Sequence, residues 1–392
     1  MALTTNGTVL AWGYTGCGAT DVPPSLSNVV SIASASCHSL AVKADGTIIG
    51  WGDDNSLQSS PPGKLMGVVA MQLGVQHGVA LKGDGTVVAW GDNSYDQSIV
   101  PAGLTNVVAV AAGAWHNLAL KTDGTITTWG ANIFGQLILP PGLSNVVAIA
   151  GGGFHSLALR NDGTVLAWGE SENGETNVPP GLTSVMAIAA GGGISLALKS
   201  NGTVVAWGEN DHGQTTVPPG LTNVISVAAG EFHTLALKAD GTVVAWGIND
   251  YGQCNVPAGL TNVIEIKAAS YNSVAMKNDG SFVVWGDTTS GQLQFPIGLS
   301  NVISVCAASA FLAAMFTDSS PVQSRFSNFR PNNTTVELNA LAEPGQTYEL
   351  ETSTNLLSWQ NLSAQTNRTG WLHFTDNPTA NSPARFYRTR LR

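Results

Sequence analysis

The sequence of 392 residues has little charge and few basic side chains. Only 11% of its residues are charged, and 16 Lys and Arg stand against 26 Asp and Glu. Phosphate backbones are bound by clustered basic residues, so this balance predicts no nucleic-acid binding. The sequence also contains no run of 18 apolar residues, and we therefore expect no membrane span.

The patterns that accompany metals, cofactors and catalysis are missing as well. The four cysteines have no metal-ligand spacing and are expected to be free thiols. No glycine-rich phosphate loop stands between a strand and a helix, and no nucleophile has an identifiable base. Glu170, Glu172 and Glu175 share one segment, which we interpret as a solvated acidic loop. We predict no catalytic residue, no metal site and no cofactor.

What the sequence does contain is a repeat. A Trp-Gly pair recurs every 39 residues, at Trp12, Trp51, Trp90, Trp129, Trp168, Trp207, Trp246 and Trp285. An Asp-Gly or Asn-Gly pair keeps the same step from Asn6 to Asp279. A fixed period of about 20–50 residues indicates a solenoid, a propeller or an array.

The unit at residues 145–183 shows which of these architectures applies. "NVVAIA" is small and apolar, "HSLALR" alternates, and "TVLAWG" is β-branched and aromatic, as in strands. "NDGT" is a hairpin turn, and the prolines of "NVPPGL" exclude a helix. Three or four short strands in one unit match a propeller blade. We predict an all-β fold, a β-propeller with eight blades by repeat count and seven as the alternative.

The pattern AAGxxHSLALKxDGTVxAWGxNxxGQ resembles the regulator of chromosome condensation repeat. The resemblance covers residues 1 to about 316 and implies a β-propeller. The short, regular units are most similar in style to the bacterial propeller that inhibits secreted β-lactamases. Relatives of this kind include exchange factors and inhibitors. Because the sequence contains no catalytic motif, we predict a non-enzymatic binding protein.

The repeat region begins and ends with incomplete units. "NGTVLAWG" supplies the later half of a blade, and "NVISVCAASAFLAAMF" supplies the complementary half. We expect these pieces to join as an eighth blade in which residues 8–12 pair with the strand at residues 311–316. Such a closure would remove exposed sheet edges.

The 39-residue period stops near the end of a first domain, residues 1–318. Residues 325–392 contain alternating segments such as "QTYELETSTN" and "GWLHFTD", which predict a small C-terminal β-sandwich. They resemble a module appended to many secreted or surface proteins of bacteria. This resemblance implies an extracellular or cell-surface location, although no leader peptide is visible in this chain. It also leaves open an alternative function, binding of glycan or cell-surface material through the module.

Function is expected in the loops that vary between copies, "AGxxHS" and "WGxxxxGQ", which open on one face of a propeller. Their large side chains are Tyr95, Trp115, Phe134, Phe154, His212, Phe232, Tyr251 and Tyr271. Because interface hot spots are enriched in aromatic residues, we predict that these eight bind a partner protein. Acidic residues of the same loops favour a partner with a basic patch. The alternative is that the aromatic side chains fold inward as loop cores.

Two further interpretations concern the recurring histidines and the acidic loop. The histidines recur at one position of the unit, at His38, His77, His116, His155 and His233, and are replaced by Ile194, Asn272 and Phe311 in the other copies. Copies about 10 Å apart do not share a zinc ion, whose Zn–N bonds are about 2.0–2.1 Å, so we expect structural roles. Paired carboxylates can hydrolyse glycosidic bonds, and a glycosidase or lyase using Glu170, Glu172 or Glu175 is the third functional alternative.

Overall fold

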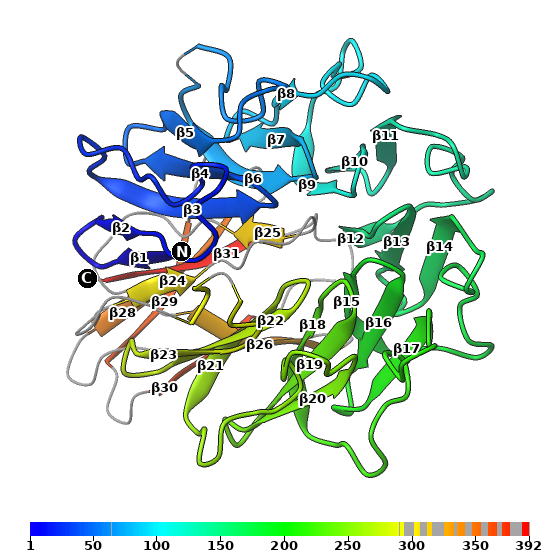
Figure 1. The fold of residues 1–392 in the computed structure, drawn as a ribbon. Coiled ribbons are helices and arrows are strands. Elements are labelled where there is room, and N and C mark those ends of the chain that lie inside the picture. The colour runs from blue at the N-terminus through cyan, green and yellow to red at the C-terminus, as the bar shows by residue number, and fades with distance from the viewer. Residues whose placement is uncertain are drawn as a thin grey trace. The chain divides into compact units, whose positions relative to one another are not determined.

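The computed structural model describes residues 1–63, 65–289 and 291–293, and beyond these only strands, between residues 302 and 391. The chain divides into two compact units, Met1–Phe316 and Thr317–Arg392. In the first unit the sheets follow one another in sequence order around a ring (Figure 1). The predicted all-β propeller of about eight blades is confirmed.

Each complete blade has three antiparallel strands, as in β12 (Val146–Gly151), β13 (His155–Arg160) and β14 (Val165–Gly169). The predicted Asp-Gly turn joins the last two, where Gly163 adopts a φ of 78° that suits glycine. The other complete blades are β3 (Val29–Ala35), β4 (His38–Lys43), β5 (Ile48–Gly52); β6 (Val68–Leu73), β7 (His77–Lys82), β8 (Val87–Gly91); β9 (Val107–Ala112), β10 (His116–Lys121), β11 (Ile126–Gly130); β15 (Val185–Ala190), β16 (Ile194–Lys199), β17 (Val204–Gly208); β18 (Val224–Ala229), β19 (His233–Lys238), β20 (Val243–Gly247); and β21 (Val263–Ala268), β22 (Asn272–Lys277), β23 (Phe282–Gly286).

The two ends of the repeat region meet in one sheet, but the strands that pair there are not the expected ones. β1 (Ala2–Thr4) pairs with β2 (Val9–Leu10) on one side and with β24 (Val302–Val305) on the other. The expected pairing of residues 8–12 with residues 311–316 is wrong, since β25 (Leu312–Met315) pairs with β6. The sequences of β1 and β25 both match the middle strand of a blade, and the blade formed by the two ends has room for only one middle strand. β1 fills that place because a tight turn already joins it to β2.

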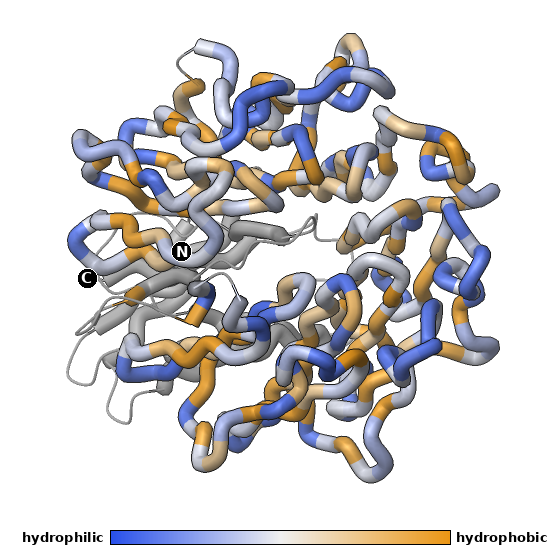
Figure 2. The backbone as a smooth tube through the Cα atoms, viewed as in Figure 1, coloured by the Kyte–Doolittle hydropathy of each residue, from blue (hydrophilic) through white to orange (hydrophobic). Residues whose placement is uncertain are grey.

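The core of the propeller lies between blades. Trp168 at the end of β14 is 5% exposed and packs in one cluster with Leu118, Ile126 and Val146, so it joins its own blade to the preceding one. Its indole N–H donates to the carbonyl of Gln136 at 2.8 Å, again across the blade boundary. Apolar residues follow strands such as β3 and β21 (Figure 2). The repeat tryptophan therefore packs one blade against the next at this boundary.

The described strands of the second unit form two antiparallel three-stranded sheets. Their strand orders are β26-β27-β30 and β29-β28-β31. The strands are β26 (Arg325–Asn332), β27 (Thr335–Leu341), β28 (Thr347–Ser353), β29 (Gln360–Thr366), β30 (Trp371–Asp376) and β31 (Phe386–Leu391). Over the described parts of both units, no helix has the length and apolar character needed to cross a bilayer.

Candidate binding face

The variable loops of each blade lie together at one end of the strands, on what is called the loop face below. In the β9-β10-β11 blade, His116 at the start of β10 pairs with Gly130 at the end of β11. The N–H of Ala131 donates to the carbonyl of Trp115 at 2.8 Å and ties the inner loop, before β10, to the outer loop, after β11. The aromatic position before the recurring histidine is thus fixed beside the outer loop of its own blade.

Neighbouring inner loops are also linked to one another. The N–H of Ala114 donates to the carbonyl of Gly152, and the N–H of Gly153 donates to that of Gly191, at 3.3 and 3.0 Å. The N–H of Gly192 continues the series to Gly230 at 3.3 Å. These backbone bonds hold the inner loops of four successive blades in a fixed arrangement.

Six of the outer loops fold around a buried side chain, which is glutamine in five of them. Gln97 is fully buried, accepts a hydrogen bond from the N–H of Tyr95 at 2.8 Å, and donates to the carboxylate of Asp92 at 2.5 Å. Its carbonyl accepts the indole N–H of Trp129 in the next blade at 3.1 Å. The glutamine anchors the loop and leaves the tyrosine ring at the surface, where it is 42% exposed.

Four of the predicted residues gather in what we call the Trp115 cluster: Tyr95, Trp115, Phe134 and Phe154. The ring centroids of Tyr95 and Trp115 are 6.0 Å apart, and those of Trp115 and Phe154 are 5.3 Å apart. Phe134 meets Phe154 edge-on at 5.2 Å. The outer-loop ring of one blade therefore packs on the inner-loop ring of the next blade.

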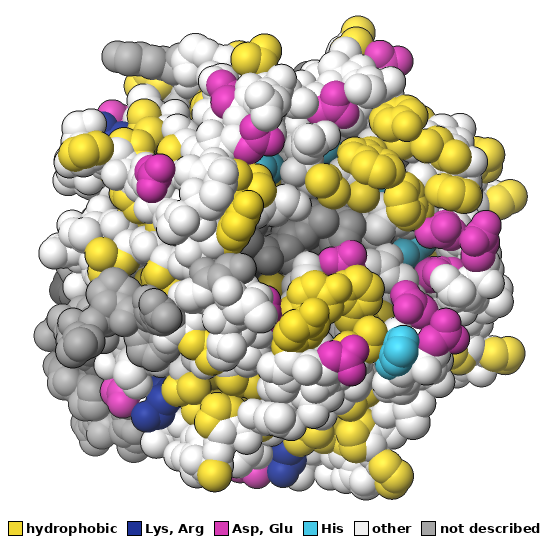
Figure 3. Space-filling view, in the orientation of Figure 1, with side chains coloured by type: hydrophobic (Ala, Val, Ile, Leu, Met, Phe, Trp, Pro, Cys, Tyr) yellow, Lys and Arg dark blue, Asp and Glu magenta, His cyan; other side chains and the backbone are white. Residues whose placement is uncertain are grey.

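Three more gather in the Tyr271 cluster: Phe232, Tyr251 and Tyr271. Phe232 stacks on Tyr271 at 5.2 Å, and Tyr251 lies 4.9 Å from Tyr271. His212, the eighth predicted residue, is exposed on the loop after β17, close enough to Glu209 for an electrostatic interaction. Figure 3 shows hydrophobic patches on this face with acidic side chains between them.

The rings of both clusters pack on one another without becoming core. Tyr251, Tyr95, Phe134 and Tyr271 are 47%, 42%, 38% and 36% exposed, and the other three rings are half-buried. The same loops also expose aliphatic side chains that sequence reasoning missed, namely Ile99, Ile133 and Ile138. The sequence could have indicated them, because their positions also vary between copies of the loop.

A hollow of about 330 Å³ separates the two clusters, and we call it the acidic hollow. Trp115 and Phe154 line one side of it and Phe232 lines another. Its carboxylates come from outer loops and an inner loop of successive blades: Glu170, Glu175, Glu209 and Glu231. The interpretation of residues 170–175 as a solvated loop is wrong for Glu175, which is 1% exposed because the loop folds around it.

The carboxylates in the hollow repel one another. Burial raises the pKa of Glu170, and the charges of Glu175 and Glu172 raise it further. Burial, together with the charges of Asp211 and Glu175, likewise raises the pKa of Glu209. No ion pair among the described residues joins a carboxylate of the hollow to a lysine or an arginine. The hollow is therefore a concentration of uncompensated negative charge.

The recurring histidines connect adjacent blades. Nε2 of His116 is hydrogen-bonded to Oγ of Ser156 in the next blade at 2.9 Å, and His155 bonds to Ser195 in the same way at 3.0 Å. Burial lowers the pKa of His116 to about 3 and that of His155 to about 4, so both are neutral at pH 7. Over the described chain, no group of three or more His, Cys, Asp or Glu is arranged to hold a metal ion.

Comparisons with known proteins agree with this architecture. The regulator of chromosome condensation (RCC1) repeat model matches five segments, residues 68–97, 107–136, 146–175, 186–214 and 224–253. A search of curated proteins found no match.

Among solved structures, the chain is similar to the ectodomain of the receptor kinase CR4 from Physcomitrella patens, with 26% identity, 66% of this chain and 73% of that chain covered, and a TM-score of 0.52. It is also similar to Prp20p from Saccharomyces cerevisiae, with 21% identity, 63% and 82% coverage, and a TM-score of 0.51. The Arabidopsis thaliana ACR4 ectodomain is 21% identical, with 66% and 98% coverage and a TM-score of 0.50. Five of the 39-residue repeats therefore match the RCC1 repeat, and residues 1–316 form an RCC1-like β-propeller.

Proposed function

We propose that this chain is a non-enzymatic binding protein whose loop face holds a partner protein. The observation that carries the proposal is the pair of aromatic clusters, which expose Tyr95, Phe134, Tyr251 and Tyr271 on one face. Exposed aromatic side chains gathered in patches mark interaction sites, and Trp and Tyr dominate interface hot spots. The repeated framework holds these rings in place before any partner arrives.

The charge of the loop face favours a partner with a basic surface. The acidic hollow lies between the clusters, and further acids such as Asp96 and Asp250 stand in the same loops. Such a rim speeds the capture of a basic partner and makes the association rate fall as salt is added. Among the similar structures, that of Prp20p is described with its binding properties to Gsp1p and histones, which supports protein binding as a use of this fold.

We also propose an extracellular or cell-surface location, which rests on the resemblance of residues 325–392 to a module of secreted bacterial proteins. Fractionation of the source organism with an antibody to the propeller tests this point. Detection in the cytoplasm alone would contradict it. Binding of the isolated C-terminal segment to polysaccharide, with no protein bound by the propeller, would favour the adhesion alternative instead.

Affinity capture from the secreted fraction of the source organism tests the main proposal. The intact chain, a Tyr251→Ala variant and a Thr86→Ala variant are immobilised side by side. Thr86 lies in a turn at the opposite end of the blade and is the matched control. A protein retained by the intact chain and by Thr86→Ala, but lost from Tyr251→Ala, supports the proposal once the purified protein shows the same order of affinities. Equal retention by all three would place binding elsewhere.

A further inference from the structure

The acidic hollow lies where the β15-β16-β17 blade departs from its two neighbours at the variable inner-loop position, which also holds the smaller or polar residues Cys37 and Gln76 in two other blades. Trp115, Phe154, Phe232 and Tyr271 occupy the position before the recurring histidine in four blades, whereas the β15-β16-β17 blade has Gly193 there. Gly193 lies between the blades of Phe154 and Phe232 and lines the hollow. The missing ring leaves the space that separates the two aromatic clusters.

The side chains nearest to the space above Gly193 are those of Glu209 and Glu175. A β-carbon built on Gly193 would lie 2.8 Å from Oε2 of Glu209 and 3.3 Å from Oε1 of Glu175. Gly193 has no positive φ, so its backbone does not require glycine. The glycine is therefore explained by the space it leaves, which brings two carboxylates from neighbouring outer loops around one point.

A second departure from the repeat adds charge to the same place. The buried residue of the outer loop is glutamine in five blades, but it is Glu175 beside the hollow; the five are Gln58, Gln97, Gln136, Gln214 and Gln253. In the next blade, Nε2 of Gln214 donates to Oε1 of Glu209 at 3.0 Å. Glu175 cannot donate to Glu170 in this way, whereas Gln58 and Gln97 each donate to an aspartate of their own loop.

Burying an uncompensated carboxylate is costly, because the charged form loses its hydration. Glu175 keeps its hydrogen bonds from the backbone N–H and the side chain of Asn173, both at 3.0 Å, but these are neutral donors. The carboxylate of Glu175 is thus costly to bury, and no lysine or arginine among the described residues forms an ion pair with it. A cation bound between the aromatic walls would compensate the charge.

We propose that the acidic hollow is a recognition pocket for one arginine side chain of the partner protein, an inference that rests on the proposed function above. A guanidinium is planar, stacks on aromatic faces and donates in a fork to carboxylates. The hollow offers Trp115, Phe154 and Phe232 as walls, with Glu175 and Glu209 as acceptors around Gly193. The volume of about 330 Å³ exceeds that of a single metal ion, and the aromatic lining suits an organic cation.

Titration of the intact chain with blocked arginine, Nα-acetyl-arginine amide, tests the pocket without the partner. Binding is followed by NMR through the indole N–H signal of Trp115. We expect saturable binding to the intact chain and none of the isosteric citrulline derivative, which lacks the charge. Blocked lysine should bind more weakly, because its ammonium cannot fork or stack in the same way. Equal binding of lysine and arginine would overturn the assignment to arginine.

Glu175→Gln is the decisive variant because it restores the residue found in the other loops. It should fold at least as stably as the intact chain, since the new amide can donate to Glu170. Loss of a charge-assisted hydrogen bond should weaken arginine binding by about ten- to a hundredfold. Glu172→Gln is the matched control, because it removes the same charge from an exposed position of the same loop and should change binding less than threefold.

Gly193→Phe fills the space directly with the side chain that neighbouring blades carry. It should abolish arginine binding while both aromatic clusters remain in place. Arginine binding unchanged in Gly193→Phe, or weakened equally by Glu175→Gln and Glu172→Gln, overturns the pocket. If blocked arginine fails to bind while Tyr251→Ala still loses the partner, only the pocket is wrong. If arginine binds but the partner is retained by Tyr251→Ala, the pocket stands and the proposed function fails.

Discussion

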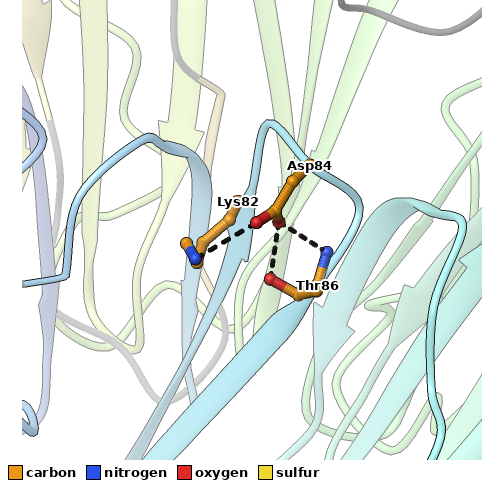
Figure 4. A network of polar contacts seen from close by, with 3 residues as sticks. All are labelled: Lys82, Asp84 and Thr86. Atoms are coloured by element: carbon orange, nitrogen blue, oxygen red, sulfur yellow. Dashed lines mark hydrogen bonds and ion pairs between the residues drawn. The ribbon is translucent and has the colours of Figure 1, made fainter.

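The two faces of the propeller are formed by loops of the same blades, yet they treat charge in opposite ways. On the turn face, where second and third strands are joined, Asp84 accepts hydrogen bonds from the N–H and hydroxyl of Thr86 and lies 3.2 Å from Nζ of Lys82 (Figure 4). On the loop face, Glu175 and Glu209 have no such cation among the described residues. The turn face, whose sequence repeats, has its acidic charges paired with cations. The loop face, whose sequence varies, carries unpaired negative charge among the described residues.

The difference teaches where sequence variation is tolerated. The framework between the faces consists of bonds that cross from blade to blade, such as the indole of Trp207 donating to the carbonyl of Glu175 at 2.8 Å. The acceptor of that hydrogen bond is a backbone carbonyl, so the bond does not depend on which side chain the residue carries. The position that holds glutamine in other blades can therefore hold Glu175 without loss of the hydrogen bond to the next blade.

Trp168→Ala attacks the framework that both faces share and should have the largest effect. Removing a buried aromatic ring from between two blades leaves a cavity, and such truncations cost about 3–5 kcal/mol. Denaturant unfolding of the propeller measures the loss. A change below about 1 kcal/mol would show that these tryptophans do not carry the packing between blades.

Trp115→Ala and Tyr251→Ala remove aromatic rings from the loop face only. Each should weaken partner binding by about 1–4 kcal/mol, the range of interface hot spots, while the propeller stays folded. Calorimetric titration of the purified partner gives the affinity, and circular dichroism reports the fold. The contrast between faces breaks down if Thr86→Ala on the turn face weakens binding by as much as these two variants.

The two groups of titrating residues should respond to acid in separate pH windows. The buried histidines have pKa values lowered by burial to about 3–4, against an ordinary value of about 6.5. Below pH 6.5 these histidines bind protons in the unfolded chain but not in the folded protein. The free energy of unfolding therefore falls between pH 6.5 and about 4. Hydrogen bonds from Thr242 lower the pKa of Asp240 to about 2, so its contribution is lost only below about pH 4.

Urea unfolding at pH 7.5, 6 and 5 should show this loss, at most about 2 kcal/mol for each histidine at pH 5. His155→Asn provides the control, because Asn272 occupies the equivalent position in another blade. This variant should lose less stability between pH 7.5 and pH 5 than the intact chain. An unchanged pH dependence would mean that His155 is not held neutral by the fold.

The fold could be predicted because its determinants recur at a fixed interval. Strands, Asp-Gly turns and repeat tryptophans each occupy one position of the unit, so eight copies support one interpretation. The closure of the ring could not be predicted, since Ala2–Thr4 and Leu312–Met315 both fit the second strand. Both segments match the repeat equally well, and only the structure shows that β1, which the Asn6-Gly7 turn joins to β2, takes the place.

The candidate site could be predicted in part. The sequence located the aromatic positions, because their residues change from copy to copy within fixed loops. It did not reveal the acidic hollow, which requires knowing that the outer loop of one blade adjoins the inner loop of the next. Gly193 and Glu175 were visible as departures from the repeat, but only the structure places them beside each other.

Asp84→Asn should have the smallest effect, and it tests whether the turn face is as neutral as it looks. Asn201 already occupies this position in another blade and accepts the same bonds from Thr203, at 3.1 Å from the N–H and 2.7 Å from the hydroxyl. The substitution therefore removes only the pair with Lys82, whose carboxylate partner is 55% exposed and screened by solvent. Exposed ion pairs contribute about 0–1 kcal/mol, so unfolding should change by well under 1 kcal/mol and partner binding should stay constant. A loss of 2 kcal/mol, or any weakening of the partner, would show that the charges of the turn face do more than cancel.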